Sequence, residues 1–413
     1  MGFGALETID VTFDGAPLRH AVTGPGGTLF TRITVPASAL PGPHTVGATG
    51  ETSGRSAQAP LTVRTEWTKF HFDDTNSGFN PYENVLNASN VSGLVEKWRF
   101  PTHAPIYGSP AIAGGVVYAG STDQYVYALN AATGKMAWRV PVSYVSSAPA
   151  VANGMVYVST GGPVVALDAR TGARVWTFHT YRGGFVSSPT VSNGVVYVGS
   201  EATATLFALN ANTGKELWSF VSSNQIGSSP AVVDGVVYIC VGDFNLYALD
   251  AATGDELWSF PADSYTSSPA VVDGVVYIEG FDGTVRAVEA STGAELWAFP
   301  TGATISGSAA VAGGVVYVGS DNGILYAVDA ATGIERWRFD AGHSFVGSPV
   351  AAADVVYAMS LDDTLYALNA ANGTNLWSVP MQSWFVGDPS PAVANGILYV
   401  GSYDKNVYAF GLP

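Results

Sequence analysis

The sequence contains a single cysteine, Cys240, among its 413 residues. One cysteine excludes an intrachain disulfide and a metal site built on several thiolates. Basic residues are also scarce, because 17 lysines and arginines stand against 33 aspartates and glutamates, a formal net charge of −16. Such an acidic chain repels nucleic-acid phosphates and anionic membrane surfaces, so we expect neither as a partner.

Long apolar runs are missing as well. Although 47% of the residues are hydrophobic, no run approaches the roughly 18 residues that a membrane-spanning helix needs. The first residues, Met1 to Glu7, have neither a basic start nor an apolar stretch, so we expect no signal peptide in this chain. The 48 glycines and 20 tyrosines instead indicate strands joined by tight turns.

A repeat dominates the chain from residue 92 onward. Tryptophan recurs at intervals of 38 to 42 residues, at Trp98, Trp138, Trp176, Trp218, Trp258, Trp297, Trp337 and Trp377. Within one interval a Ser-Pro pair leads an apolar run, as in Ser229–Val233, and a two-residue turn follows, as in Asp234-Gly235. Three more strand-like runs come next, in this unit Val236–Ile239, Leu246–Asp250 and Glu256–Phe260. Four short strands per unit are typical of a β-propeller blade.

The count of strands predicts how the ring closes. Eight units begin with a first strand, at Ser109, Ala148, Ser188, Ser229, Ser268, Ser308, Ser348 and Ser390. There are also eight tryptophan strands, but the first, Glu96–Phe100, precedes every first strand, and the last unit ends at Val407–Phe410 without one. We therefore expect residues 92–413 to form an eight-bladed propeller whose last blade is completed by the N-terminal strand, which leaves no open sheet edge.

The tryptophan strands also carry a family resemblance. The stretch Ala248–Trp258 resembles the tryptophan-docking motif of pyrroloquinoline-quinone-like propellers, the group that includes quinoprotein dehydrogenases and the outer-membrane assembly lipoprotein. Complete copies recur at 128–138, 166–176, 208–218, 287–297, 327–337 and 367–377. The resemblance implies that the eight repeat tryptophans are structural and that each indole packs on the turn of the neighbouring blade.

Residues 1–64 have a different pattern, which predicts a separate β-module. The expected strands are Ile9–Phe13, Leu29–Val35, His44–Ala48 and Pro60–Val63. The segment Val35–Val46 is similar to bacterial Ig-like modules, although a full sandwich has about 100 residues, so we expect a truncated start. Residues 65–91 are expected to form an irregular connector, in which Asp73–Gly78 is interpreted as an Asp/Asn turn rather than a calcium loop, because its oxygen spacing is wrong.

The loops between blades differ most among the repeats, and loops on a rigid scaffold commonly carry function. Aromatic, histidine and arginine side chains in these loops are the candidate binding residues, namely His103, Tyr107, Tyr144, Tyr181, Arg182, His343 and Trp384. The histidines enter different blades, so no shared metal site is expected. A recurring apolar position beside them is interpreted as packing, at Ile106, Val145, Phe185, Ile226, Tyr265, Ile305, Phe345 and Phe385. Acidic turns are interpreted as solvated hairpin turns, at Asp123, Glu201, Asp243, Asp282, Asp321, Asp362 and Asp404.

No catalytic motif is present. The sequence contains no Gly-x-Ser-x-Gly turn, no His-Glu-x-x-His helix and no Walker loop. We therefore expect no catalytic residue, no metal ligand and no cofactor. The leading hypothesis is a monomeric, non-enzymatic binding or scaffolding propeller, exported or displayed on a bacterial surface, which recognises a protein, peptide or glycan through its loops.

Two other interpretations stay open. The resemblance also implies a quinone- or metal-dependent oxidoreductase. In that branch of the family, long insertions bind the quinone and a calcium ion and, in the alcohol dehydrogenases, two adjacent cysteines form a disulfide. The repeats here have almost no insertions and there is one cysteine. The third interpretation is a structural module that spaces other domains of a surface protein.

Overall fold

The computed structural model describes residues 2–36, 38–180, 184–264, 267–345, 347–381 and 390–413. The chain divides into two compact units, Met1–Thr65 and Glu66–Pro413. Strands make up nearly all of the regular structure, and a single turn of 3₁₀ helix, η1 (Val91–Gly93), is the one helical element among the described residues. None of the described helical structure is long and apolar enough to cross a membrane.

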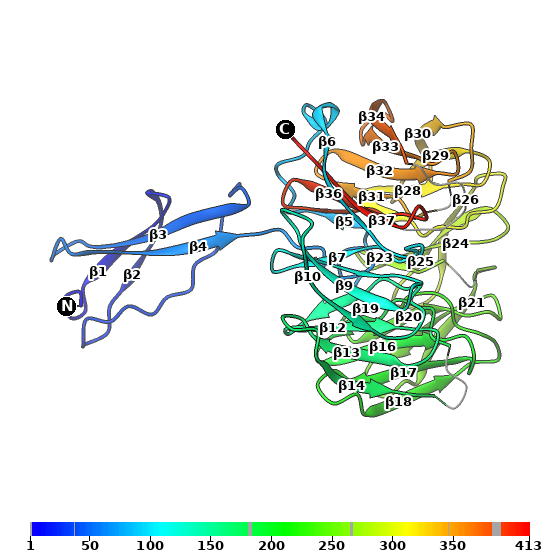
Figure 1. The fold of residues 1–413 in the computed structure, drawn as a ribbon, viewed down its shortest axis with the longest axis horizontal. Coiled ribbons are helices and arrows are strands. Elements are labelled where there is room, and N and C mark those ends of the chain that lie inside the picture. Colours follow the sequence, from blue (N-terminus) through cyan, green and yellow to red (C-terminus); the bar gives the residue numbers. More distant parts are fainter. Residues whose placement is uncertain (1, 37, 181–183, 265–266, 346, 382–389) are drawn as a thin grey trace. The chain divides into compact units, whose positions relative to one another are not determined.

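The first unit is a four-stranded antiparallel sheet. Its strands are β1 (Thr8–Phe13), β2 (Ala16–Val22), β3 (Gly42–Gly50) and β4 (Ser56–Val63), paired in the order β2-β1-β3-β4 (Figure 1). Ile9, Val11 and Phe13 alternate along β1 and are buried, which places the residues between them on the open face.

The expected strand at Leu29–Val35 is wrong. These residues have no regular structure, Phe30 is 91% exposed, and β2 is a strand that the sequence pattern did not predict. The physical reason is that the sheet is built from β2-β1-β3-β4 and residues 29–35 do not pair with it. The Arg32 carbonyl accepts a hydrogen bond from the Arg19 side chain of the edge strand β2, which is a contact to a side chain and not a backbone ladder.

The second unit contains eight sheets in the part of the chain that the structure describes (Figure 1). The first four sheets consist of β7 (Ala111–Ala113), β8 (Val116–Gly120), β9 (Tyr125–Asn130), β10 (Met136–Pro141); β11 (Ala150–Ala152), β12 (Met155–Ser159), β13 (Val164–Asp168), β14 (Arg174–Phe178); β15 (Thr190–Ser192), β16 (Val195–Ser200), β17 (Thr205–Asn210), β18 (Glu216–Val221); and β19 (Ala231–Val233), β20 (Val236–Cys240), β21 (Asn245–Asp250), β22 (Glu256–Pro261). In each sheet, four strands that follow one another in the chain pair in order.

The other four sheets follow the same plan. They consist of β23 (Ala270–Val272), β24 (Val275–Glu279), β25 (Thr284–Glu289), β26 (Glu295–Pro300); β27 (Ala310–Ala312), β28 (Val315–Gly319), β29 (Ile324–Asp329), β30 (Glu335–Asp340); β31 (Val350–Ala352), β32 (Val355–Ser360), β33 (Thr364–Asn369), β34 (Asn375–Pro380) with the added β5 (Phe79–Asn80); and β35 (Ala392–Ala394), β36 (Ile397–Gly401), β37 (Asn406–Gly411) with β6 (Val95–Pro101).

The sheets are arranged as a ring, so the second unit is a β-propeller. The short first strands contact one another in sequence from β7 through β11, β15, β19, β23 and β27 to β31, and β35 contacts β7. The N-terminal strand β6 pairs with the C-terminal strand β37, with Trp98 opposite Ala409. Strands from the two ends of the repeat array therefore share one sheet, as the strand count predicted.

Each repeat indole joins its own sheet to the next one. The N–H groups of the eight tryptophans donate to backbone carbonyls at distances from 2.8 to 3.2 Å, and the acceptors are Ala131, Ala169, Ala211, Ala251, Ala290, Ala330, Ala370 and Leu94. A tyrosine hydroxyl shares the carbonyl in most sheets, as Tyr238 does with Trp258 at Ala290. At the last junction, where Leu94 is the acceptor, the Tyr357 hydroxyl has no partner among the described residues.

Residues 66–80, the first part of the expected irregular connector, belong to the second unit and run along its inner strands. We call them the strap. The carbonyls of Thr68, Asp74, Thr75, Ser77 and Gly78 accept hydrogen bonds of 2.7 to 2.8 Å from inner-strand N–H groups, those of Val151, Val232, Val271, Val311 and Ala351. Trp67 pairs with Ile112 in the first sheet, and the Asn80 amide reaches the Val393 carbonyl in the eighth. The strap therefore links sheets on all sides of the ring.

The strap is buried as well as bonded. The Lys69 ammonium donates to the Asp73 carbonyl at 2.8 Å and to the Asn76 side chain at 3.0 Å, and burial lowers its pKa to about 8. The Asp73 carboxylate accepts hydrogen bonds from the backbone and hydroxyl groups of Thr75 and Ser77. The Asp73 carboxylate is therefore held by the hydrogen bonds of an Asp/Asn turn, the kind of turn that the sequence indicated.

Replacing Gly254 with alanine is expected to destabilise the second unit more than replacing Gly235 with alanine. Both glycines have a left-handed φ, 80° and 81°, so both variants share the backbone cost. A Cβ at Gly254 would lie 2.6 Å from the Trp218 ring, whereas nothing lies within 4 Å of one at Gly235. The indole contact should add about 1–3 kcal/mol to the loss of unfolding free energy.

Urea unfolding followed by tryptophan fluorescence measures this difference. All ten tryptophans lie between residues 67 and 384, so the signal reports the second unit alone. Equal losses in the two glycine variants would show that the indole contact does not stabilise the ring.

Candidate functional site

A series of serine hydroxyls links successive sheets of the ring at the points where the loops enter the inner strands. Each hydroxyl accepts a hydrogen bond from the equivalent backbone N–H of the preceding sheet. The five pairs are Ala148 to Ser188, Ser188 to Ser229, Ser229 to Ser268, Ser268 to Ser308 and Ser308 to Ser348, at 2.8 to 3.0 Å. The recurring serine before each first strand is therefore structural, since its hydroxyl satisfies a buried backbone donor.

A cavity lies where this series of hydroxyls is interrupted. Position 148 is alanine, so it offers no hydroxyl to the preceding sheet. A cavity of about 270 Å³ adjoins it, and its lining residues are Phe70, Tyr107, Gly108, Ser109, Tyr144, Ser146, Ser147, Ala148, Val186 and Ser188. We call it the loop cavity. It contains aromatic rings, hydroxyls and backbone groups from three neighbouring sheets and the strap.

The loop cavity carries no formal charge in its described lining. Tyr107 packs edge-on against Tyr403, with ring centroids 5.7 Å apart. Burial and the neighbouring Tyr403 hydroxyl raise the pKa of Tyr107 to about 12, so its phenol is neutral. Tyr144 is 44% exposed and offers its ring to solvent. The cavity therefore suits a neutral group with an apolar surface.

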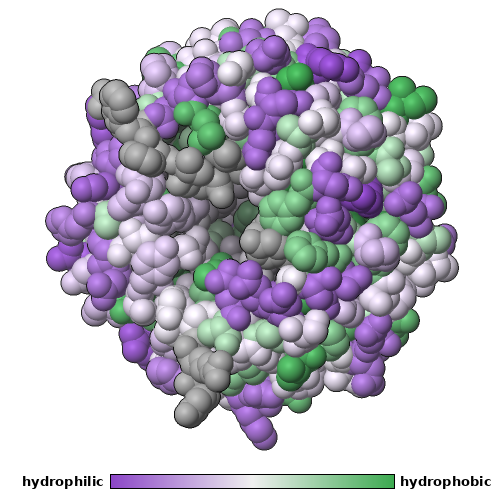
Figure 2. All heavy atoms as spheres, turned by 90° about the vertical axis from the view of Figure 1, so that its right-hand side faces the viewer, coloured by the Kyte–Doolittle hydropathy of each residue, from purple (hydrophilic) through white to green (hydrophobic). Residues whose placement is uncertain are grey.

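The candidate residues from the sequence divide into three groups. Tyr107 and Tyr144 line the loop cavity together. His103 and His343 are exposed and lie outside its lining, and the His103 backbone N–H donates to Asp123 at 2.9 Å. Tyr181, Arg182 and Trp384 lie outside the described residues. Figure 2 shows that the second unit is hollowed near the centre of one face, with hydrophilic side chains over much of the surrounding surface.

Sequence reasoning missed Phe70, the strap residue in the cavity lining. A signal was present, because Trp67, Phe70, Phe72 and Phe79 are too many large aromatic side chains for a solvated connector. The recurring apolar loop position is buried, as packing predicts, at Ile106, Val145, Phe185, Ile226, Ile305 and Phe345. Tyr265 and Phe385 fall outside the described residues.

The acidic turns between second and third strands are occupied by local hydrogen bonds. The Asp123 carboxylate accepts from the Tyr127 hydroxyl, Asp243 from Tyr247, and Asp404 from Tyr408. Asp282 pairs with Arg286 in the same way. These four turns are hairpin turns whose carboxylates have short-range partners.

One carboxyl group is buried beneath the loops. Glu279 ends β24 at a position that is glycine in several other sheets, and it is 1% exposed. One carboxyl oxygen accepts a hydrogen bond from the Ser267 hydroxyl, and the other has no partner among the described residues. Burial raises the pKa of Glu279 to about 8, so the group is largely protonated at neutral pH.

Comparison with known proteins places this ring in a family. The family described as outer membrane protein assembly factor BamB matches residues 95–180, 160–280 and 281–412. The chain belongs to that BamB family. The BamB protein of Yersinia pestis is 34% identical over 175 residues, which are 37% of this chain and 44% of that protein. The quinone alcohol dehydrogenase subunit of Gluconobacter oxydans is 30% identical over 185 residues, 38% of this chain and 24% of the subunit.

Solved structures show the same fold. BamB of Moraxella catarrhalis has a TM-score of 0.65 and 20% identity, and covers 77% of this chain and 99% of its own. Quinohemoprotein alcohol dehydrogenase of Comamonas testosteroni has a TM-score of 0.72 and 16% identity, over 84% of this chain and 80% of its own. The fold alone is therefore common to BamB and to quinone enzymes.

The loop cavity does not fit a quinone cofactor. Pyrroloquinoline quinone is a tricarboxylate, and a bound calcium ion needs several oxygen ligands, so the site requires cationic side chains and carboxylates together. The described lining contains neither: its side chains are phenyl, phenol, hydroxyl and small apolar groups. The described lining of the loop cavity therefore offers no donor set for this cofactor.

Replacing Glu279 with glutamine is expected to stabilise the second unit more at pH 8.5 than at pH 5. The folded pKa is about 8, above the usual 4.5, so the folded state holds a proton that the unfolded state releases. Below pH 4.5 the carboxyl group is protonated in both states, so its titration does not lower the free energy of unfolding. As pH rises from 4.5 to 8, the unfolded state releases the proton first, and the free energy of unfolding of the wild type decreases. Glutamine abolishes the loss, which is on the order of 2–4 kcal/mol.

Urea unfolding at the two pH values tests this, with the exposed Glu256→Gln in the neighbouring sheet as the matched control. A Glu279→Gln effect that does not depend on pH would mean that Glu279 is ionised in the folded protein.

Proposed function

We propose that this chain is a non-enzymatic binding scaffold of an exported bacterial protein, an eight-bladed propeller behind an Ig-like module. It recognises a protein partner through the loops between its sheets. The observation that carries the proposal is the loop cavity, an uncharged recess with aromatic and hydroxyl side chains on a rigid ring. Membership of a family named for an assembly factor supports it.

The chemistry of the cavity favours a side chain or turn of a protein. Tyrosine rings supply contact area at low entropic cost and are enriched where protein interfaces derive most of their energy. Ser146 also lines the cavity beside the aromatic surface, so a neutral polar group can be hydrogen bonded by its hydroxyl there. We assign the other candidate residues from the sequence, His103, Tyr181, Arg182, His343 and Trp384, to the same interface.

The cavity also lacks the parts of a catalytic centre. General acid–base or nucleophilic chemistry needs a base within hydrogen-bond reach of the reacting group. The described lining has no histidine, carboxylate, lysine or thiol. Two of its serines have structural partners: Ser147 donates to the Ser159 carbonyl, and Ser188 accepts the Ala148 N–H. Binding is therefore the activity that these residues support.

A photo-crosslinking residue at Tyr144 is expected to capture the partner in cells of the source organism, and the same residue at Leu257 is expected not to. Both positions are about half exposed, at 44% and 53%, but Leu257 lies on the outer strand β22. With the captured protein purified, Tyr144→Ala should weaken its affinity by about tenfold or more.

Equal capture at Tyr144 and Leu257 would contradict recognition through the loop cavity. Reduction of a dye by the chain after incubation with pyrroloquinoline quinone and calcium would contradict the non-enzymatic assignment.

A further inference from the structure

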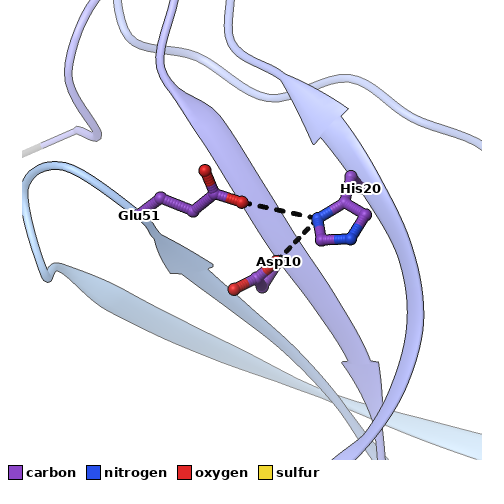
Figure 3. Close-up of side chains that lie close together, drawn as sticks. All are labelled: Asp10, His20 and Glu51. Atoms are coloured by element: carbon purple, nitrogen blue, oxygen red, sulfur yellow. Dashed lines mark ion pairs between the residues drawn. The ribbon is translucent and has the colours of Figure 1, made fainter.

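Three potential metal ligands converge on the open face of the first unit (Figure 3). The His20 Nδ1 atom lies 2.7 Å from Asp10 Oδ1 and 3.5 Å from Glu51 Oε1. All three ligand atoms lie within 4.8 Å of one another. The same ring nitrogen therefore faces two carboxylates from two other parts of the sheet.

The register of the sheet fixes this arrangement. Asp10 on β1 is directly opposite His20 on β2. Glu51 follows β3, and its backbone N–H donates to the Thr8 carbonyl at 3.0 Å, which ties it to the start of β1. The side chains come from three segments separated in sequence, so no local spacing of residues predicts the cluster.

The other carboxylates of this unit have structural partners. Glu7 accepts hydrogen bonds from Gly4, Thr52 and Ser53. Asp14 is bonded to the Thr45 N–H and to His44, whose second nitrogen bonds the Leu40 carbonyl.

Asp10 and Glu51 differ from these two carboxylates. In the described part of the chain, the Asp10 and Glu51 carboxylates each form an ion pair with His20. Two carboxylates so close together repel each other, and one imidazole N–H cannot satisfy both fully. A cation bound between them removes the repulsion.

We propose that Asp10, His20 and Glu51 bind a divalent transition-metal ion, for which Zn²⁺ is the probe. Zinc–ligand bonds of about 2.0–2.2 Å place tetrahedral donors about 3.3 Å apart, close to the observed separations. One imidazole and two carboxylates form a donor set that suits zinc and its first-row neighbours. Two negative charges neutralise the ion.

The site has room for an additional ligand. A recess of about 500 Å³ adjoins it, lined in part by Asp10, Thr12, Leu18 and His20. Three protein ligands leave a coordination position of a tetrahedral ion open to water or to a donor from another molecule. The neighbouring Arg19 does not compete, because its guanidinium donates to the Arg32 carbonyl at 2.7 Å.

Isothermal titration of the full chain with ZnCl₂ tests the proposal. One ion should bind per wild-type chain, and His20→Ala should weaken binding by about tenfold or more. Asp10→Asn should weaken it too, because it keeps the shape and removes a charge. His20 has a side chain that is 74% exposed, so neither variant is expected to unfold the sheet, which far-ultraviolet circular dichroism checks.

The matched control is His179→Ala, an exposed histidine of the second unit, which should bind zinc as the wild type does. Absence of wild-type binding at about 100 μM zinc, where a three-ligand site should be filled, would overturn the proposal. So would unchanged binding by His20→Ala, or a loss confined to His179→Ala.

Discussion

The ring depends on one repeated interaction, the hydrogen bond from an indole N–H to a backbone carbonyl of the next sheet. Each bond contributes about 1 kcal/mol, and burial of the indole adds several more. Because each sheet needs its neighbour for this contact, the array behaves as a chain of nearest-neighbour interactions. Closure by β6 and β37 completes the chain and removes its two ends.

Two inner systems support the outer indoles and position the cavity. Serine hydroxyls join successive sheets, and the strap accepts backbone hydrogen bonds from inner strands around the ring. Both systems are irregular near the first three sheets, where Ala148 lacks a hydroxyl and the strap contributes Phe70. The loop cavity lies at this departure from the repeat, and the equivalent positions of regular repeats have equivalent surroundings. The buried Glu279 is a second departure of this kind.

Features with a local pattern could be predicted from the sequence, and features that depend on distant partners could not. The four strands of each unit follow from the repeat of about 40 residues. The pairing of β6 with β37 follows from the count of tryptophan strands, because the Trp98 strand precedes every first strand. The strap has no periodicity because its partners belong to the ring. Residues Leu29–Val35 have a strand-like composition, but they join none of the strands of the first sheet. Loop variation identified Tyr107 and Tyr144, whereas Phe70 and the Asp10–His20–Glu51 cluster depend on tertiary neighbours.

Closure of the ring is tested most directly by comparing two deletions through urea unfolding with tryptophan fluorescence. Deleting residues 92–101 removes β6 and Trp98, so we predict a loss of unfolding free energy of more than about 3 kcal/mol. Deleting residues 1–65 removes the other compact unit, so we predict a change below about 1 kcal/mol. Equal effects, or a ring that keeps its stability without residues 92–101, would contradict closure by the N-terminal strand.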